Sequence, residues 1–481
     1  MGTSLKHPSG EVLRPARRKA GGGGVNRLTP VRIAVAWSMA TYVLFVFGPW
    51  AYPMRYSVVL FALVALYNLS IYAGFRRGAT RPPRRHYGDT GVKSFNIDRL
   101  LNFAFFATLV LFPIRLVIAT QNYSLDWSLF VSKVVTGLSS AQENYSQRFV
   151  VTPPGIWGVL NHVNVLLGFI AWLYVPLLIL VWERASMAKR ALGVVVVIGS
   201  ILASVARGQN FGAFDVVAQL VAFILIRRAG FAAKNGARQK MFGGRAWKIL
   251  APALFVFFFL SFFANTMKSR IGDQFRSLLV IQGGSVPIDE SSALWNLTPP
   301  PLQPVFASIS MYVSHGYAAL RLAVDESFST TYGIGGSYFL LDNASELDPG
   351  LQARTFQAKL EASQGYDSHA LWHTAYLWIA NDVSLLGVPI ILYGMFMLFG
   401  RAWRDYVERG NLFGALMMAP MTAFVALISS SNQIAGQPHA LFGTFALIFA
   451  WLGTRHRVAW PPRSASRSAG RSARRRVAGR G

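Results

Sequence analysis

The sequence predicts an all-α fold, a polytopic transmembrane helical bundle of about ten spans with both termini in the cytoplasm and a large, partly helical outer loop. Three observations predict it. Hydrophobic residues make up 53% of the 481-residue chain, which is more than a water-soluble core of this size needs. Apolar runs long enough to cross a hydrocarbon layer of about 30 Å recur along the chain. Basic segments alternate with those runs.

Ten apolar runs are the predicted spans. The fifth and the last three are short or interrupted by Gly and Pro, so their ends are defined only to within several residues. In chain order the runs are Val31–Trp50, Ser57–Gly74, Leu100–Thr120, Trp157–Val181, Ala191–Ala206, Phe211–Ile226, Leu250–Phe263, Leu385–Phe399, Leu412–Ile428 and Ala440–Leu452.

The distribution of charge predicts the orientation, because cationic loops are retained in the cytoplasm. The segments assigned to that side hold 36 of the 47 Lys and Arg residues and 6 of the 20 Asp and Glu residues. They are 1–33, 76–99, 183–190, 227–248, 401–410 and 455–481. This excess of basic residues is explained by topology and by attraction to anionic membrane lipid, so no nucleic-acid partner is expected.

The same pattern predicts five regions. They are a disordered basic arm 1–30, spans one to seven over 31–265 with an outer loop 121–156, a large outer loop 266–370, spans eight to ten over 371–455, and a disordered basic tail 456–481. The large loop carries ten acidic residues, one Trp and five Tyr residues. Loops of this length are usually functional or disordered, and the aromatic content favours an ordered outer cap.

Arginines on the outer side are the first candidate functional residues. Arg207 lies in a short turn between two spans, Arg270 and Arg276 follow the seventh span, and Arg115 lies in the outer half of the third. A cation on this side opposes the orientation signal unless it binds an anion. The alternative interpretation is that each one pairs with a nearby acid, such as Asp215, or reaches lipid phosphate.

Histidines near the outer ends of spans are the second group, because an imidazole can transfer protons. They are His162, His315, His369, His373 and His439. The i, i+4 spacing of His369 and His373 suits a metal pair, but no third ligand accompanies it, so no metal is predicted. With no cysteine, no P-loop and no dinucleotide fingerprint, the chain shows no sign of thiolate chemistry or of a cofactor.

Four segments resemble the O-antigen and oligosaccharide repeat-unit polymerases, over about residues 190–400. They are Ser204–Gly208 before a span, Met311–Tyr317 with Tyr332–Gly335 in the large loop, and Trp372–Asp382 entering the next span. The resemblance implies a bacterial cytoplasmic-membrane glycosyltransferase that needs neither metal nor cofactor. Such an enzyme moves a growing glycan from undecaprenyl pyrophosphate to the non-reducing end of another lipid-linked oligosaccharide. A flippase and a chain-length regulator are the expected partner proteins.

This resemblance gives the candidate residues their roles. Arg207 and Arg270, assisted by Arg276, are expected to bind the pyrophosphate, since a guanidinium matches its geometry. The base that accepts the proton of the attacking hydroxyl is expected to be Asp367, His369 or His315. Aromatic and polar side chains of the outer loop and the following span are expected to bind the glycan, namely Arg321, Tyr332, Trp372, Tyr376 and Asp382.

Three alternatives remain open. An O-antigen ligase would share the fold and the donor but use another acceptor. A C-type transferase using a polyprenyl-phosphate monosaccharide usually has an acidic pair in its first outer loop, whereas the loop Ala51–Tyr56 has no acid. A transporter or flippase would place charged residues within spans and break helices in paired repeats, but Asp215 is the one clear intraspan acid and no internal repeat is found.

Overall fold

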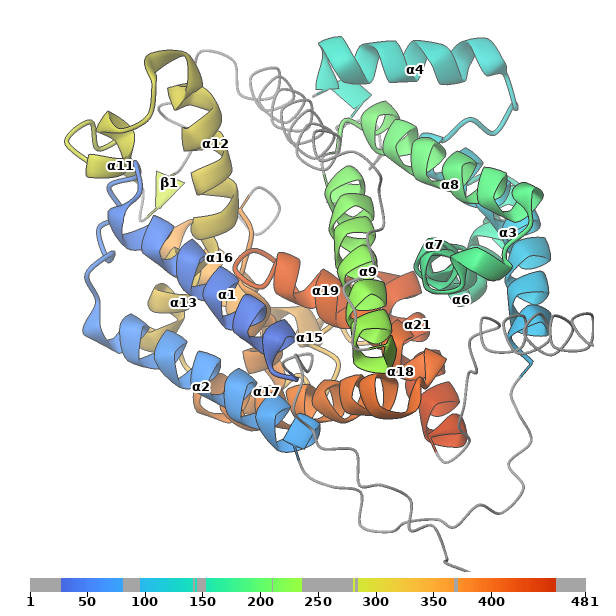
Figure 1. Cartoon of the computed structure of the whole chain (residues 1–481). Coiled ribbons are helices and arrows are strands. Elements are labelled where there is room, and N and C mark those ends of the chain that lie inside the picture. The colour runs from blue at the N-terminus through green and yellow to red at the C-terminus, as the bar shows by residue number, and fades with distance from the viewer. Residues whose placement is uncertain are drawn as a thin grey trace, which may run out of the picture.

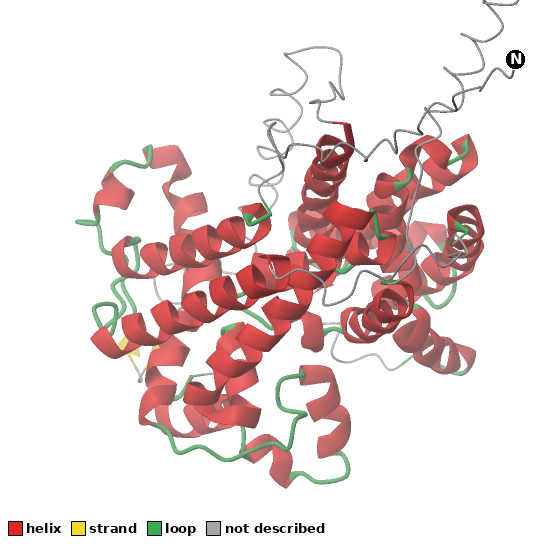
Figure 2. Cartoon of the chain, turned by 60° about the horizontal axis from the view of Figure 1, so that its bottom comes forward, coloured by secondary structure: helices red, strands yellow, loops and turns green. Residues whose placement is uncertain are grey.

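The computed structural model describes residues 27–80, 96–141, 143–144, 153–209, 211–235, 280–281, 284–366 and 371–455. Helices account for nearly all the elements in these ranges (Figures 1 and 2). The strands there are β1 (Val280–Ile281) and β2 (Gly284–Ser285), which form one antiparallel pair. The prediction of an all-α fold is therefore confirmed for the described residues.

The helices fall into three groups along the chain. Before the large loop they are α1 (Thr29–Phe47), α2 (Val58–Thr80), α3 (Ile97–Thr120), α4 (Trp127–Ser139), α6 (Ile156–Leu167), α7 (Phe169–Leu180), α8 (Met187–Ala206) and α9 (Phe211–Asn235). Within it they are α11 (Ala293–Asn296), α12 (Gln303–Ser314), α13 (Gly316–Leu322), α14 (Tyr338–Ser345), α15 (Gly350–Ala353) and α16 (Phe356–Gln364). After it they are α17 (Ala375–Arg409), α18 (Leu412–Leu416), α19 (Met418–Ala426), α20 (Gln433–Gly436) and α21 (Pro438–Thr454).

Several of these helices are able to cross a membrane. By length and composition α1, α2, α3, α8 and α17 qualify, and α6 with α7 makes a sixth span if this pair, bent by 43°, is counted as one. Large apolar side chains on their outer faces are exposed, as at Phe103, Phe106 and Val110 of α3, which is typical of a surface that contacts lipid.

The predicted spans agree with the helices in position more than in number. Every predicted run on described residues is helical, whereas the run Leu250–Phe263 lies outside the described residues. The last two runs correspond to shorter apolar helices, so the count of ten stays a prediction. Helix α17 as a whole begins at Ala375, ten residues before the predicted eighth run, but Ser384 has a left-handed φ of 65° and separates two helical stretches. The predicted start at Leu385 coincides with the start of the second stretch.

Helix ends that were predicted to lie on the same side of the membrane contact one another in the structure. Contacts at one end of the bundle join Arg27 to Glu408 at 2.8 Å, Arg404 to the carbonyl of Gly78 at 3.4 Å, and Arg227 to Glu183. All of these positions were predicted to be cytoplasmic. At the other end Arg55 pairs with Asp289 at 2.8 Å, and the Ser292 hydroxyl donates to the carbonyl of Phe47 at 2.8 Å.

Glycines bring α2 and α17 into close contact. A Cβ atom added at Gly74, Gly78 or Gly400 would lie 2.2–2.3 Å from a backbone oxygen of the opposite helix. Gly74 and Gly78 form a GxxxG spacing, which lets membrane helices approach at backbone distance. In Figure 1, α1, α2 and α17 form one group and α3, α7 and α8 another, with α9, α19 and α21 between them.

The large loop does more than cover the bundle. Its helix α13 packs against α2 and α17, and Tyr317 is fully buried there. The Tyr317 hydroxyl lies 3.0 Å from the Thr41 hydroxyl and donates to the carbonyl of Ser38 at 3.2 Å, both on α1. This part of the loop is therefore a component of the core and positions the segments on either side of it.

Cysteine labelling will test the orientation in this naturally cysteine-free chain. Ser285 in the large loop and Thr80 at the end of α2 are both exposed, at opposite predicted sides. We expect an impermeant maleimide to label Ser285→Cys in intact cells, and Thr80→Cys only after the membrane is permeabilised. Labelling of Thr80→Cys but not of Ser285→Cys in intact cells would reverse the predicted topology.

Candidate functional site

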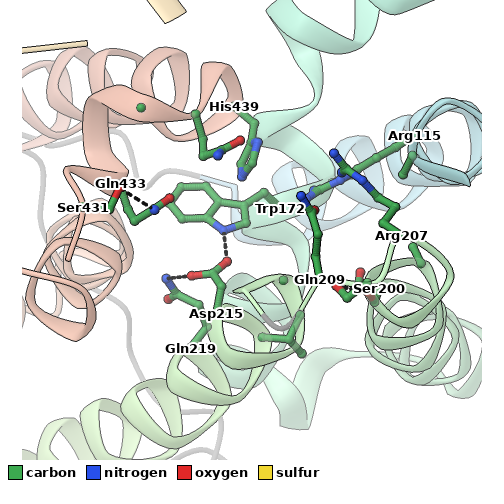
Figure 3. Close-up of a pocket in the computed structure, with 18 of the residues that line it drawn as sticks. Arg115, Trp172, Ser200, Arg207, Gln209, Asp215, Gln219, Ser431, Gln433 and His439 are labelled. Carbon is green, nitrogen blue, oxygen red and sulfur yellow. Dashed lines mark hydrogen bonds between the residues drawn. The ribbon is translucent and has the colours of Figure 1, made fainter. Parts of the chain in front are cut away.

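A cavity of about 550 Å³ lies in the part of the bundle formed by α3, α7, α8, α9 and α21 (Figure 3). This volume is within the range of about 300–1,000 Å³ that is typical of small-molecule sites. Its walls come from α3, α7, α8 and α9, from the connection between α19 and α21, and from the outer-loop residues near α12 and α14. Two of these wall segments are connections between helices, the α8–α9 turn and the α19–α21 connection, and both contribute side chains.

Two arginines form the cationic part of the cavity, and a histidine lies beside them. Arg115 extends from α3, Arg207 follows the last residue of α8, and His439 is the second residue of α21. Figure 3 shows the Arg115 and Arg207 side chains pointing toward the same region, and His439 is an electrostatic neighbour of both. Like charges that converge in a partly dry space repel one another, so this arrangement favours a bound anion.

The local sequence explains how Arg207 is positioned. Helix α8 ends because Gly208 adopts a left-handed φ of 58°, a conformation that costs glycine little. A Cβ atom at Gly208 would lie 2.0 Å from the carbonyl oxygen of Ala141, and one at Gly137 of α4 would lie 1.9 Å from that of Val205. Close packing against α4 therefore fixes the turn that carries Arg207.

Asp215 is the acidic side chain among the described residues that line the cavity. It lies on α9 with 9% of its surface exposed. Its carboxylate accepts hydrogen bonds from Trp172 Nε1 at 3.0 Å and from Gln219 Nε2 at 3.4 Å, and Arg115 is an electrostatic neighbour. A carboxylate offers about four lone-pair sites, so two remain for other partners.

Amide side chains form a second polar wall, made of Gln219, Asn432 and Gln433. Their amide nitrogens donate to neighbouring protein groups. Gln219 donates to the carbonyl of Ala419 at 3.0 Å, Asn432 to that of Gly336 at 2.8 Å, and Gln433 to the Ser431 hydroxyl at 2.9 Å. These bonds orient the three side chains within the wall.

Aromatic rings line the part of the cavity next to the outer loop. The rings of Tyr312 and Trp372 are 4.8 Å apart, and those of Tyr338 and Trp378 meet edge to face at 6.2 Å. Aromatic faces of this kind can pack against a sugar ring or an aliphatic chain. Trp372, predicted to bind glycan, is thus brought to the same cavity as Arg207.

His315 does not line the cavity, and both of its ring nitrogens have protein partners. Nδ1 lies 2.7 Å from the carbonyl oxygen of Met311, and Nε2 accepts the backbone N–H of Trp372 at 2.6 Å. Burial lowers the pKa of His315 to about 4, so the ring is neutral at pH 7. This geometry gives His315 the role of holding Trp372 in place and leaves no nitrogen to act as a base.

Asp382 holds a loop of the backbone in place. Its carboxylate accepts the backbone N–H groups of Gly333, Gly335 and Gly336 at 2.8–3.0 Å and the Thr331 hydroxyl at 2.6 Å. These bonds fix the loop whose residue Gly336 lines the cavity. Asp382 therefore shapes the wall from outside the cavity.

Three further candidates lie elsewhere. The side chain of Tyr376 is fully buried in the core, with its hydroxyl 3.0 Å from that of Ser38. Tyr332 is 70% exposed beneath the Arg354 guanidinium, and Arg321 pairs with Asp325 at 2.7 Å. The structure does not bring any of these three to the cavity.

Four predicted residues, Asp367, His369, Arg270 and Arg276, lie outside the described residues. The roles predicted for them stay predictions, as does the pairing of His369 with His373. Within the part of the chain that the structure describes, no group of three or more His, Asp or Glu side chains is arranged to hold a metal ion.

The amide wall was missed at the sequence level. Gln219 lies within a predicted span, and Asn432 and Gln433 follow a run of serines that resembles an ordinary turn. Polar side chains at membrane depth are rare and usually functional, which is the signal that could have identified Gln219. Arg115 and His439 were noted for their position, but the resemblance gave them no role.

Comparison of the chain with known protein families, with curated proteins and with solved structures finds no match.

Proposed function

We propose that this protein is a membrane glycosyltransferase that polymerises lipid-linked oligosaccharide units. The observation that carries the proposal is the cavity, in which Arg115, Arg207 and His439 converge beside Asp215, a wall of amides and a rim of aromatic rings. Cationic, apolar and hydrogen-bonding surfaces then meet in one place. A polyprenyl-pyrophosphate-linked glycan has the matching anionic, apolar and hydroxyl-bearing parts.

The chemistry requires charge stabilisation at the leaving group. The acceptor hydroxyl oxygen attacks the anomeric carbon of the donor glycan, and a new glycosidic C–O bond forms there. The bond from that carbon to the pyrophosphate oxygen breaks, and its electron pair leaves with undecaprenyl pyrophosphate. Guanidinium groups of Arg115 and Arg207 hold the pyrophosphate through charge-assisted hydrogen bonds, which strengthen as negative charge develops. The N-terminus of α21, next to His439, adds a further positive field.

The proton of the attacking hydroxyl needs an acceptor. Asp215 suits this step, because its carboxylate lies in the cavity and the indole of Trp172 and the amide of Gln219 hold it in place. Asp367 and His369 stay as further predicted bases, since they precede Trp372 in the chain.

Placement in the bacterial cytoplasmic membrane, with the site toward the outer leaflet, belongs to the same proposal. The separate grouping of the helix ends supports it, and Arg115, Arg207 and His439 lie on the end opposite to the basic cluster near Arg404. Flippase-delivered substrate would then reach the cavity from the outer side.

Purified protein in lipid nanodiscs provides the direct test. Given undecaprenyl-pyrophosphate-linked oligosaccharides extracted from the source membranes, we expect a ladder of lipid-linked products that grow by one unit, with release of undecaprenyl pyrophosphate. EDTA should leave the ladder unchanged, because arginines supply the positive charge. Mass spectrometry of the products checks both points. Single transfer to another acceptor would favour a ligase, and the absence of any transfer would contradict the proposal.

A further inference from the structure

The amide wall holds three carbonyl oxygens for which the structure records no hydrogen-bond partner among the described residues. They are Oε1 of Gln219, Oδ1 of Asn432 and Oε1 of Gln433. All three side chains are buried, with 4%, 7% and 4% of their surface exposed. They line the same cavity as Arg115 and Arg207.

An unpaired buried acceptor is unfavourable, and native proteins keep few of them. Three on one wall of one cavity therefore indicate a ligand that donates hydrogen bonds. Water fills such positions in an empty site, and ligand hydroxyl or N–H groups replace it on binding. A metal cation is a poor occupant here, because Arg115 and Arg207 repel positive charge.

We propose that Gln219, Asn432 and Gln433 select the sugar that is attached directly to the pyrophosphate of the lipid carrier. This inference rests on the proposed function. Because the free atoms are all acceptors, the sugar must present hydrogen-bond donors, either free hydroxyls or an acetamido N–H. A carrier whose first sugar has its hydroxyls O-methylated offers at most an acetamido N–H as donor. At least two of the three oxygens then stay unpaired, so this carrier binds more weakly, as expected for a site built around hydrogen bonds.

Gln433 is the position for a clean test. Its nitrogen bonds only to the neighbouring Ser431 hydroxyl in the recorded contacts, whereas Gln219 also holds Asp215. Gln433→Met keeps the length of the side chain and removes the acceptor. Gln357→Met is the matched control, because Gln357 is an equally buried amide whose oxygen accepts from Asn381 Nδ2 at 2.9 Å, away from the cavity.

Binding of three probes to nanodisc-reconstituted protein is measured by thermal shift and titration. The probes are undecaprenyl pyrophosphate, the same lipid carrying one N-acetylglucosamine, and its O-methylated form. We expect wild type to bind the N-acetylglucosamine lipid most tightly. Gln433→Met should weaken the binding of that lipid alone by about tenfold, which is the effect of one lost hydrogen bond. The melting temperature of the protein without ligand should not fall.

Gln357→Met should lower the melting temperature and leave the order of the three probes unchanged. Equal binding of the sugar-bearing and sugar-free lipids by wild type would overturn the inference, as would a Gln433→Met variant with wild-type preference. Either result is independent of catalysis. If polymer forms but the protein binds the three lipids equally, only this inference is wrong. If the protein prefers the sugar-bearing lipid but transfers no glycan, only the proposed function is wrong.

Discussion

Replacing Arg207 with alanine is expected to abolish glycan chain extension while the protein remains folded and inserted. The guanidinium projects into the cavity together with that of Arg115, and in the proposed reaction it binds the leaving pyrophosphate there. Removing one group that stabilises a developing anion costs on the order of 10²–10³-fold in rate. Product length on a gel, normalised to the amount of membrane-inserted protein, measures the effect.

Arg207→Lys separates recognition from simple charge. An ammonium keeps the positive charge but loses the planar fork that binds two phosphate oxygens, so we expect poor rescue. Arg55→Ala is the control, because Arg55 lies on the same side but pairs with Asp289 at 2.8 Å outside the cavity. Full-length polymer from Arg207→Ala would remove this residue from the site and most of the support for a polymerase.

The early part of the fold could be predicted from sequence because its signal is local. An uninterrupted apolar run must be helical in a bilayer, and the prediction Val31–Trp50 corresponds to α1 at Thr29–Phe47. The late spans were harder, since α17 bends at Ser384 and α18 to α21 are short segments whose ends are set by packing. A Cβ atom at Gly414 of α18 would lie 2.4 Å from the carbonyl oxygen of Ala402 on α17, so close packing against α17 holds this short segment.

Residues of the candidate site could be predicted where a side chain's charge conflicts with its position or where a segment resembles a known family. Arg207 could be found because a cation on the outer side opposes the orientation signal, and Trp372 because it lies in a recognisable segment. His315 and Asp382 were chosen for their residue type, but their partners are distant in sequence. Trp372 lies 57 residues from His315, and Gly336 lies 46 residues from Asp382. Local patterns do not contain such pairings.

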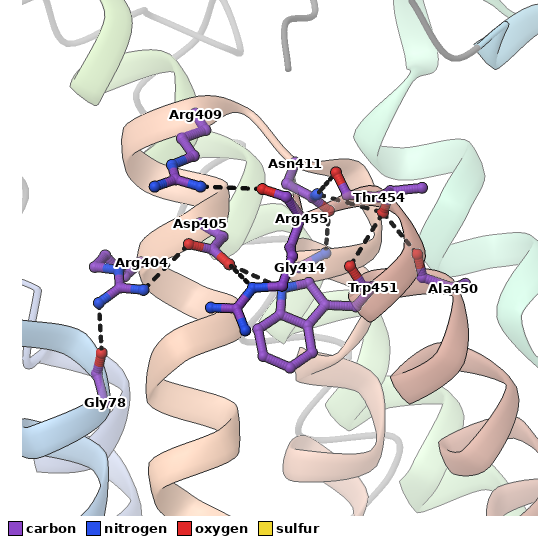
Figure 4. Close-up of polar contacts among 10 residues, drawn as sticks. All are labelled: Gly78, Arg404, Asp405, Arg409, Asn411, Gly414, Ala450, Trp451, Thr454 and Arg455. Atoms are coloured by element: carbon purple, nitrogen blue, oxygen red, sulfur yellow. Dashed lines mark hydrogen bonds and ion pairs between the residues drawn. The ribbon is translucent and has the colours of Figure 1, made fainter. Parts of the chain in front are cut away.

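The end of the bundle that is predicted to face the cytoplasm contains a buried ion cluster, and its loss is the second large expected effect (Figure 4). Asp405 is fully buried near the end of α17. Its carboxylate lies 3.3 Å from Arg404 Nη2 and 3.7 Å from Arg455 Nε, and it accepts a hydrogen bond from Trp451 Nε1 at 3.1 Å. Through Arg404 and the carbonyl of Gly78, the cluster connects α17 and α21 to α2.

Asp405→Ala is therefore expected to lower the free energy of unfolding by roughly 3–5 kcal/mol, the usual cost of leaving a buried partner charge uncompensated. Arg404 is only 4% exposed and would lose its carboxylate. Asp405→Asn keeps the shape and the bond from Trp451, so it should lose most of the same stability through charge alone. Melting temperature in detergent reports the change.

Glu408→Ala is the control. It removes the more exposed 2.8 Å pair with Arg27 and should lower the free energy of unfolding by about 0–1 kcal/mol. If Asp405→Asn has the same melting temperature as wild type, hydrogen bonding and packing rather than charge stabilise this end of the bundle.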